Sequence, residues 1–361
     1  MSRPVPRLGP GVELIGEMRG SGSFDVPWLI RRGDGRALAV SALLFQIAAE
    51  VDGRSDAATI ARRVSARAGR PVGASDVGWL LDNKLRPLGV VAGDRAGAEA
   101  SPGPGSGPTS GPAGRRRLRL RALFKVGVVP VAAVDRVATG LSPLFHPAAV
   151  AAFLGALVGV DLWLLLGSTP LPGAATVVGD PWSASLVLAL TLAAGAFHEA
   201  GHAAGARYGG ASPGRVGVGF YLVWPVFFSD LNDSYRLDRT GRLRADLGGV
   251  YFNVVFIVAL AGAYALTGAA VLLVVIVLHH VLAARQFLPF VRLDGYYIVS
   301  DLAGVPDLFG RIGPVLTSLL PGRAAALDDL RPAARRLVTA WAIATVTALA
   351  VLLLLAVRRL V

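Results

Sequence analysis

The sequence predicts a mainly α-helical membrane protein, a polytopic helical bundle of five or six spans that follows a small α+β soluble domain. Of its 361 residues, 53% are hydrophobic, and the mean hydropathy of +0.56 is too high for an ordinary soluble protein. Charge is concentrated in residues 1–145, whereas the remainder contains nearly uncharged runs of about 20 residues, the length that crosses a bilayer. The predicted spans are residues 148–168, 183–206, 247–268, 270–290 and 336–357.

Residues 1–92 are predicted to form the soluble domain. Residues Trp28 to Val40 alternate in polarity around Gly33-Asp34-Gly35, which indicates a β-hairpin. Helix-start signals follow at three places, and Val90-Val91 indicates a short closing strand. The three predicted helices begin at Ser41 and end at Asp52-Gly53, begin at Ser55-Asp56 and end at Gly69, and begin at Ser75-Asp76. This order predicts a winged-helix-like unit.

Two segments connect this domain to the membrane part. Residues 93–114 are rich in Pro, Gly and Ser, with few bulky apolar side chains, and are predicted to be a disordered linker. Residues 115–146 begin with an arginine cluster between Arg115 and Arg121, which predicts an interfacial segment on anionic lipid. Basic residues before a first span place the N-terminus in the cytosol. No secretory signal peptide is expected, because residues 1–30 lack an apolar core.

The composition also restricts the function. A net charge of +12 could suggest a nucleic-acid partner, but in a membrane protein the position of the charges matters more than their sum, so none is expected. The absence of cysteine excludes a disulfide framework, a thiolate zinc site and a cysteine nucleophile. Any bound metal must therefore be held by His, Asp or Glu.

The strongest motif is His198-Glu199-Ala200-Gly201-His202, near the end of the second predicted span. Positions i and i+4 share one helix face, so His198 and His202 can reach one metal ion, with Glu199 beside them as general base. Zinc held this way activates water and polarises a carbonyl group. Ionisable residues in an apolar span usually mark function, and a structural role in helix packing is the less favoured alternative.

A second polar segment, from Gln286 through Pro289 to Asp294-Gly295, follows the fourth predicted span. Together with the first motif it resembles the site-2-protease-type intramembrane zinc metalloproteases, which pair HExxH with an NxxPxxxxDG motif. The resemblance implies that Asp294 is the third zinc ligand and that Pro289 and Gly295 belong to the substrate-binding loop. Gln286 stands where the family has Asn, and its amide can bind the substrate backbone. Alternative third ligands are Asp230, Asp233 and Asp246.

Residues 216–237, between the two motifs, favour a re-entrant hairpin or an edge strand over another span. They resemble the corresponding region of the peptide zinc metalloprotease branch of that family, and an exposed edge could hold an extended substrate. Asn253 in the third span is either a substrate-binding group or a helix-packing residue.

Four further polar residues are interpreted as structural. His146 is expected at the membrane interface, His279 and His280 in hydrogen bonds between helices, and Asp161 on a water path or bonded to a neighbouring helix. With a cytosolic N-terminus, the second and fourth spans both bring their motifs to the cytosolic side. The fifth span then leaves Arg358-Arg359 outside, against the positive-inside rule, so either the last segment returns or a span lies between 301 and 335.

The stretch Glu50–Val64 and the order of elements in residues 1–92 resemble the PqqD-like domains that bind leader peptides of ribosomally made natural products. The combined resemblance implies a multi-pass cell-membrane zinc endopeptidase that matures such a peptide, with the lipid bilayer and a leader peptide as partners. Two alternatives stay open: intramembrane proteolysis of a membrane-anchored regulator, and a non-hydrolytic membrane protein for peptide export or immunity. DNA binding by the winged-helix-like unit is the weaker interpretation.

Overall fold

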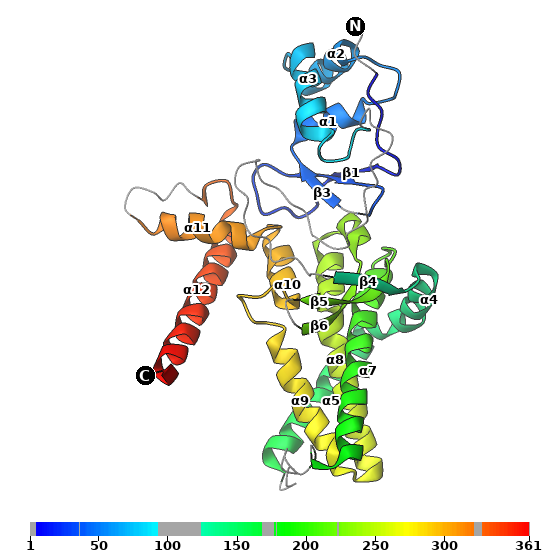
Figure 1. Ribbon diagram of the computed structural model, residues 1–361, viewed down its shortest axis with the longest axis vertical. Coiled ribbons are helices and arrows are strands. Elements are labelled where there is room, and N and C mark those ends of the chain that lie inside the picture. Colours follow the sequence, from blue (N-terminus) through cyan, green and yellow to red (C-terminus); the bar gives the residue numbers. More distant parts are fainter. Residues whose placement is uncertain are drawn as a thin grey trace. The chain divides into compact units, whose positions relative to one another are not determined.

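The structure is a computed structural model that describes residues 5–35, 37–92, 124–167, 177, 179–221, 224–320 and 327–360. At 124–126, 220–221, 224–226 and 360 only the backbone is described. The predicted linker 93–114 and the arginine cluster lie outside the described residues. The chain divides into two compact units (Figure 1): Met1–Arg117 with Ala303–Thr339 form the first, and Leu118–Leu302 with Ala340–Val361 form the second.

The N-terminal part of the first unit contains a three-stranded antiparallel sheet in the order β1-β2-β3. The predicted hairpin is confirmed, because Trp28 of β2 faces Val40 of β3 and Gly35 turns with a φ of 84°. Strand β1 was not predicted. Its Gly16 has a φ of 118° at a register shift, and this irregularity breaks the alternation that identifies strands. The strands are β1 (Glu13–Glu17), β2 (Trp28–Arg31) and β3 (Ala37–Val40).

Three helices share one hydrophobic core with this sheet: α1 (Ala42–Ala49), α2 (Ala57–Ala68) and α3 (Ala74–Leu80), the last continued by a π-helical turn, Leu81–Leu85. Ser41 and Asp56 cap α1 and α2 through their side chains, as predicted, and Gly69 ends α2 in the left-handed conformation. Helix α3 begins at Ala74, so Ser75 and Asp76 lie inside its first turn.

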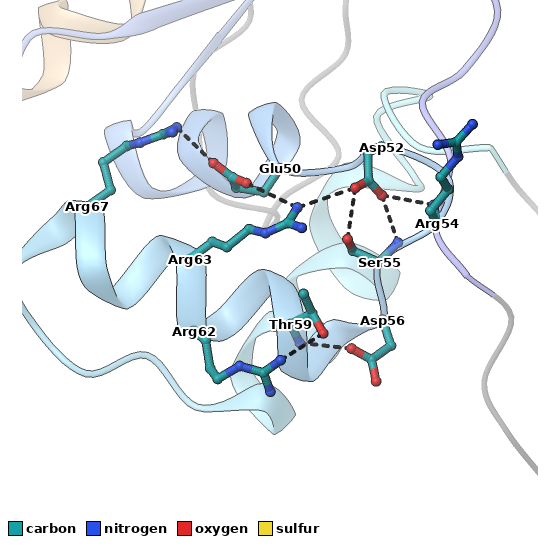
Figure 2. Close-up of polar contacts among 9 residues, drawn as sticks. All are labelled: Glu50, Asp52, Arg54, Ser55, Asp56, Thr59, Arg62, Arg63 and Arg67. Carbon is teal, nitrogen blue, oxygen red and sulfur yellow. Dashed lines mark hydrogen bonds and ion pairs between the residues drawn. The ribbon is translucent and has the colours of Figure 1, made fainter.

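Two predicted details of this domain are wrong. Helix α1 ends at Ala49, before the predicted Asp52-Gly53, because the Asp52 carboxylate accepts the backbone N–H groups of Arg54 and Ser55 and forms a turn (Figure 2). Val91 makes an isolated bridge with Leu8 rather than a strand. The helix faces are confirmed in the core, where Ile60, Val64, Val77, Leu81 and Leu85 are buried together.

The first unit also contains helix α11 (Leu308–Ser318), which belongs to the C-terminal part of the chain. Gly22 links the two parts, because its N–H donates to Gly304 O at 2.9 Å and its carbonyl accepts from Arg331 N at 2.8 Å. A Cβ atom on Gly22 would lie 1.9 Å from Ala303 O. Only glycine fits this approach, and the sequence contained no signal for it.

The second unit is helical, with a small sheet. Its helices are α4 (Val131–Leu141), α5 (Pro147–Leu166), α7 (Pro181–Tyr208), α8 (Arg239–Thr267), α9 (Ala270–Arg285) and α10 (Asp294–Ala303), and α12 (Pro332–Leu360) crosses the boundary between the units. Four helices of the described chain, α5, α7, α8 and α12, are long and apolar enough to cross a membrane. Figure 1 shows α5, α7, α8 and α9 running alongside one another, and they pack together.

Helix α9 is shorter than the span predicted at 270–290, because the chain leaves the helix after Arg285. Its 16 residues rise about 24 Å at 1.5 Å per residue. From Gly249 to the end of α8 at Thr267 the same rise amounts to about 27 Å. Helix α9 is therefore long enough to bring the chain back to about the level of Gly249, and α10 begins there.

The small sheet has the order β4-β5-β6, with β4 (Phe124–Val129), β5 (Val216–Tyr221) and β6 (Trp224–Ser229). Strands β5 and β6 confirm the hairpin predicted within 216–237, with β6 at an edge of the sheet. Strand β4 was not predicted, since residues 115–146 were interpreted as interfacial.

The closest approach of α7 and α8 occurs at a pair of glycines. A Cβ atom on Gly201 would lie 2.3 Å from Gly248 O, and one on Gly248 would lie 2.3 Å from Gly201 O. The two backbones therefore touch at a point where no other residue fits. This contact places the first turns of α8 directly against His202.

Candidate metal centre

Three side chains from two helices converge in the second unit: His198 and His202 of α7 and Asp294, the first residue of α10. The two imidazole Nε2 atoms lie 3.2 Å apart. Asp294 Oδ2 lies 3.0 Å from His198 Nε2, and Asp294 Oδ1 lies 3.4 Å from His202 Nε2. The histidines each expose 7% of their surface. The prediction that these three residues meet is confirmed.

These distances are those of ligands around one ion. In a tetrahedral site with bonds of about 2.0–2.1 Å, the edge between two ligand atoms is about 3.3–3.4 Å. The 3.2 Å between the two imidazole nitrogens is close to this edge, and each nitrogen has one of the two Asp294 oxygens at 3.0 or 3.4 Å. One ligand atom from each of the three residues lies within 4.8 Å of the others. The group could therefore hold a metal ion, with at least one coordination position left for another ligand.

The environment of His202 orients its ring for such a role. Its Nδ1 lies 2.8 Å from the carbonyl oxygen of Ala245 in α8. A carbonyl only accepts, so Nδ1 carries the proton, and the lone pair of the neutral ring is on Nε2, which faces His198 and Asp294. The N–H of Gly249 lies farther from the same nitrogen, at 3.4 Å. The Ala245 contact thus presents a ligand nitrogen to the centre.

Asp294 is positioned by the turn between α9 and α10. The N–H of Gly295 donates to Gln286 O at 2.9 Å and closes this turn. A Cβ atom on Gly295 would lie 2.8 Å from the Cα of Phe287, which explains the glycine. The two carboxylate oxygens of Asp294 face the Nε2 atoms of both imidazoles, at 3.0 and 3.4 Å. Asp294 is therefore placed as a ligand group.

Gly249 of α8 lies directly beneath the ligands. A Cβ atom there would be 2.4 Å from His202 Nε2 and 2.5 Å from His198 Nε2, so only glycine leaves room for both rings. Asn253 lies one turn farther along α8, on the same face as Gly249, and is buried. Its predicted place close to the histidines agrees with this geometry, and its role in substrate binding stays a prediction.

Glu199 is buried beside the two ligands, with 8% of its surface exposed. Its charge interacts with His202. Its backbone carbonyl accepts a hydrogen bond from Ser229 Oγ at 3.1 Å, which ties the end of β6 to this turn of α7. One turn earlier, a Cβ atom on Gly195 would lie 2.8 Å from the ring of Phe227. Strand β6 therefore lies directly against the helix that carries the motif.

Among the described residues, the alternative ligands Asp230, Asp233 and Asp246 do not join the metal-binding group. Asp230 accepts from Asn232, and Asp233 accepts from Ser212 N and pairs with an arginine of its own loop. Asp246 lies closer, because its charge interacts with His202 and Asp294, but it also interacts with Asp301 of α10.

The loop residues Gln286 and Pro289 were predicted to bind substrate. Gln286 Oε1 is buried and has no hydrogen-bond partner among the described residues. The carbonyl of Pro289 accepts from Thr345 Oγ1 of α12 at 3.2 Å. Both residues border the turn that presents Asp294, and their contact with substrate stays a prediction.

The remaining polar residues of the helices have structural partners. His280 Nε2 lies 2.9 Å from Asp161 Oδ1, so α9 and α5 are joined, and the expected bond to a neighbouring helix is confirmed. His279 Nδ1 bonds to its own helix at Val275 O, which differs from the expected bond between helices. His146 caps α5, with Nδ1 3.3 Å from Ala148 N.

Ala245 and Gly249 are site residues that the sequence did not predict. Ala245 acts through its backbone, so its side chain carries no signal. The pair Gly248-Gly249 at the start of an apolar helix was a usable signal, because adjacent glycines are expensive in a helix unless a close approach requires them. Comparison of the chain with protein-family models, curated proteins and solved structures found no match.

Proposed function

We propose that this protein is a membrane-embedded zinc endopeptidase of the site-2-protease type. The observation that carries the proposal is the convergence of His198, His202 and Asp294 at the spacing of metal ligands, with Glu199 on the next position of the same helix. Two imidazoles and one carboxylate with an open position form the ligand set of hydrolytic zinc enzymes. Nitrogen and oxygen donors in a chain without cysteine also suit zinc.

In this proposal the chain's residues divide the work of hydrolysis. Zinc, when bound, supplies Lewis acidity that polarises the scissile carbonyl and acidifies water. Glu199 accepts a proton from the attacking water while the water oxygen forms a bond to the carbonyl carbon. The C–N bond then breaks, and Glu199 delivers the proton to the leaving nitrogen, which departs as an amine. His198, His202 and Asp294 hold the ion, and Ala245 O keeps the His202 ring in the required tautomer.

Strand β6 is the proposed substrate platform. It is an edge strand, and Ser229 joins its end to the backbone of Glu199. An extended peptide added to this edge would run past the catalytic glutamate through main-chain hydrogen bonds. Asn253, Gln286, Pro289 and Gly295 are the proposed substrate-binding residues beside it.

The proposed substrate is a small, ribosomally synthesised peptide, which the protein would mature by removing its leader. A hairpin, three helices and a third strand in residues 5–92 support a winged-helix-like, peptide-capturing domain. The proposed orientation has this domain in the cytosol, in accordance with the basic residues that precede the first span.

Metal content tests the site. Detergent-purified wild-type protein is expected to hold close to one zinc per chain, and His202→Ala and Asp294→Ala are expected to lose it. Matched controls are His146→Ala and Asp135→Ala, which remove an exposed histidine and a half-buried aspartate outside the group. Zinc retained by Asp294→Ala would refute its ligand role. Wild-type protein free of zinc after purification in zinc-supplemented buffer would refute the proposed centre.

Hydrolysis is tested separately. Wild-type protein reconstituted in liposomes is incubated with a diverse peptide library, and new termini are identified by mass spectrometry. Glu199→Gln is expected to keep its zinc and to produce none of these products, because the amide cannot accept the proton from water. Products that persist with Glu199→Gln would contradict the assigned mechanism.

A further inference from the structure

A buried ion pair joins α8, whose Gly249 packs against the two histidines, to α10, whose first residue is Asp294. Arg242 of α8 donates through Nε to Asp301 Oδ1 of α10 at 3.0 Å and through Nη1 to Leu237 O at 3.0 Å. The Arg242 side chain has no exposed surface and that of Asp301 exposes 15%. Taking both charges out of water is expensive, and replacement by apolar side chains would often cost nothing. The pair therefore calls for an explanation other than stability.

The spacing of the contacts along α8 and α10 suggests what the ion pair does. On α8, Arg242 and Gly249 are seven residues apart, and on α10, Asp294 and Asp301 are also seven residues apart. Seven residues are close to two helical turns, so each pair shares one helix face. Gly249 lies beneath the nitrogens that Asp294 contacts, and Arg242 binds Asp301. The helices thus run antiparallel, joined directly by the ion pair and, about 10.5 Å along, through the two imidazoles that lie between Gly249 and Asp294.

Contacts at both ends of α10 fix its rotation and its translation. At its start, α10 is held by the Gly295–Gln286 bond and by Tyr296, which is 2% exposed and packs on Trp341. At its end the ion pair sets the register. A slip of one residue would move Asp294 by about 1.5 Å and turn it by about 100°, whereas metal–ligand distances vary by only about 0.2 Å.

We infer that Arg242 and Asp301 are positioning residues, which hold α10 in the register that brings Asp294 to the metal. The inference rests on the proposed metal centre and adds a determinant of its affinity. Neither residue touches the ion, and both act through the placement of Asp294. Variants in residues that orient metal ligands from outside typically lower metal affinity 10- to 100-fold, and this is the effect expected here.

The test measures zinc affinity of the full-length, detergent-purified protein by competition with a chromophoric chelator. Arg242→Gln and Asp301→Asn are each expected to weaken zinc binding about 10- to 100-fold. With Co²⁺ in place of zinc, the visible absorption that reports a tetrahedral ligand field is expected to change in both variants. Wild-type affinity and an unchanged spectrum in both would overturn the inference.

A double variant separates positioning from folding. Arg242→Met with Asp301→Leu replaces the pair by apolar side chains of similar size, which usually preserves or raises stability. Its thermal unfolding temperature is expected at or above that of the wild type, with zinc affinity still reduced. Wild-type affinity in this double variant would show that the pair contributes packing alone and would overturn the inference.

The matched control is Arg207→Met with Asp135→Leu, which removes a pair at 3.5 Å between α7 and α4 whose side chains are 37% and 40% exposed. Wild-type zinc affinity is expected there. Equal loss in the control would overturn the specific role of Arg242 and Asp301. Failure of the proposed centre gives a different pattern, because the wild-type protein would then bind no zinc; that result would overturn both proposals together.

Discussion

Two of the groups of ionisable side chains in the second unit differ in how their hydrogen-bonding needs are met. In the first, Asp161 of α5 faces His280 of α9, whose nitrogens lie 2.9 Å from Asp161 Oδ1 and 2.8 Å from Ile276 O. Each nitrogen faces an oxygen. The side chains of His280 and Asp161 are 32% and 41% exposed, so water can supply further hydrogen bonds.

In the second group, ring nitrogens of His198 and His202 and carboxylate oxygens of Asp294 face one another. Nitrogen faces nitrogen at 3.2 Å, and a carboxylate lies against both. His202 spends its ring proton on Ala245 O, outside the group. The difference teaches that polar side chains of apolar helices indicate a ligand when several nitrogens and carboxylate oxygens face one another with little access to water. The second group meets this condition and could hold a cation, whereas the first group does not meet it.

The largest expected effect is a loss of zinc, caused by a larger side chain at Gly249, where the two histidine rings leave no space. Gly249→Ala would place a methyl group 2.4 Å from His202 Nε2 and 2.5 Å from His198 Nε2. The rings must then move by about 1 Å to reach ordinary van der Waals contact, well beyond the tolerance of about 0.2 Å for metal–ligand distances. The variant is expected to lose stoichiometric zinc, as measured by elemental analysis of the purified protein.

Gly262→Ala is the matched control. Gly262 also lies on α8, and a Cβ atom there would have no neighbour within 4 Å. Alanine is the better helix former by about 1 kcal/mol, so this variant is expected to be at least as stable as the wild type, with unchanged zinc. Full zinc occupancy in Gly249→Ala would contradict the position assigned to the ligand nitrogens.

A smaller effect, of a different kind, is expected in the first group. Asp161→Leu removes one partner and leaves His280 without its carboxylate. Hydrogen bonds between helices in a membrane contribute about 1–2 kcal/mol, so the thermal unfolding temperature should fall while zinc content stays at the wild-type level. The double variant Asp161→Leu with His280→Leu should recover part of the loss. A parallel loss of zinc would break the distinction between the two groups.

Local rules were enough to predict one half of the metal centre. His198 and His202 are four residues apart in an apolar run, and helix geometry alone places them on one face. The caps Ser41 and Asp56 and the turn at Gly35 were equally readable, because each depends on a few adjacent residues.

The other half depends on contacts between distant parts of the chain. Asp294 was predicted from a resemblance, since nothing within its own segment distinguishes it from Asp246 or Asp230 as a ligand. The pairing of Arg242 with Asp301 and the role of Ala245 O arise only when α7, α8 and α10 pack, so no local pattern could show them. Strand β1 was missed because Gly16 interrupts its alternation.

The smallest expected effect concerns Asp52 of the N-terminal part, a carboxylate whose oxygens accept hydrogen bonds from the neighbouring backbone. Asp52 accepts the backbone N–H groups of Arg54 and Ser55 at 2.8 and 2.7 Å (Figure 2). These hydrogen bonds hold the pKa of Asp52 below its ordinary value of 3.8, with the bond from Arg54 as the largest cause and those from Ser55 next. A depressed pKa in the folded state means that the turn is stabilised above pH 3.8 and loses this stabilisation as the pH falls.

Hydrogen exchange of the full-length protein tests this sign. Protection of the Arg54 and Ser55 amides, corrected for the intrinsic exchange rate at each pH, is expected to be level near pH 6 and to decline below about pH 4, the ordinary range of an Asp pKa. Asp52→Asn should be less protected at pH 6 and should show no such decline, because the amide does not titrate. The control Asp82→Asn, which removes a carboxylate paired with the Arg86 side chain, should match the wild type. Wild-type protection at pH 6 in Asp52→Asn would show that charge contributes nothing to this turn. The comparison between Asp52 and the metal-binding group would then rest on the solvent exposure of the side chains and no longer on how their hydrogen-bond acceptors are satisfied.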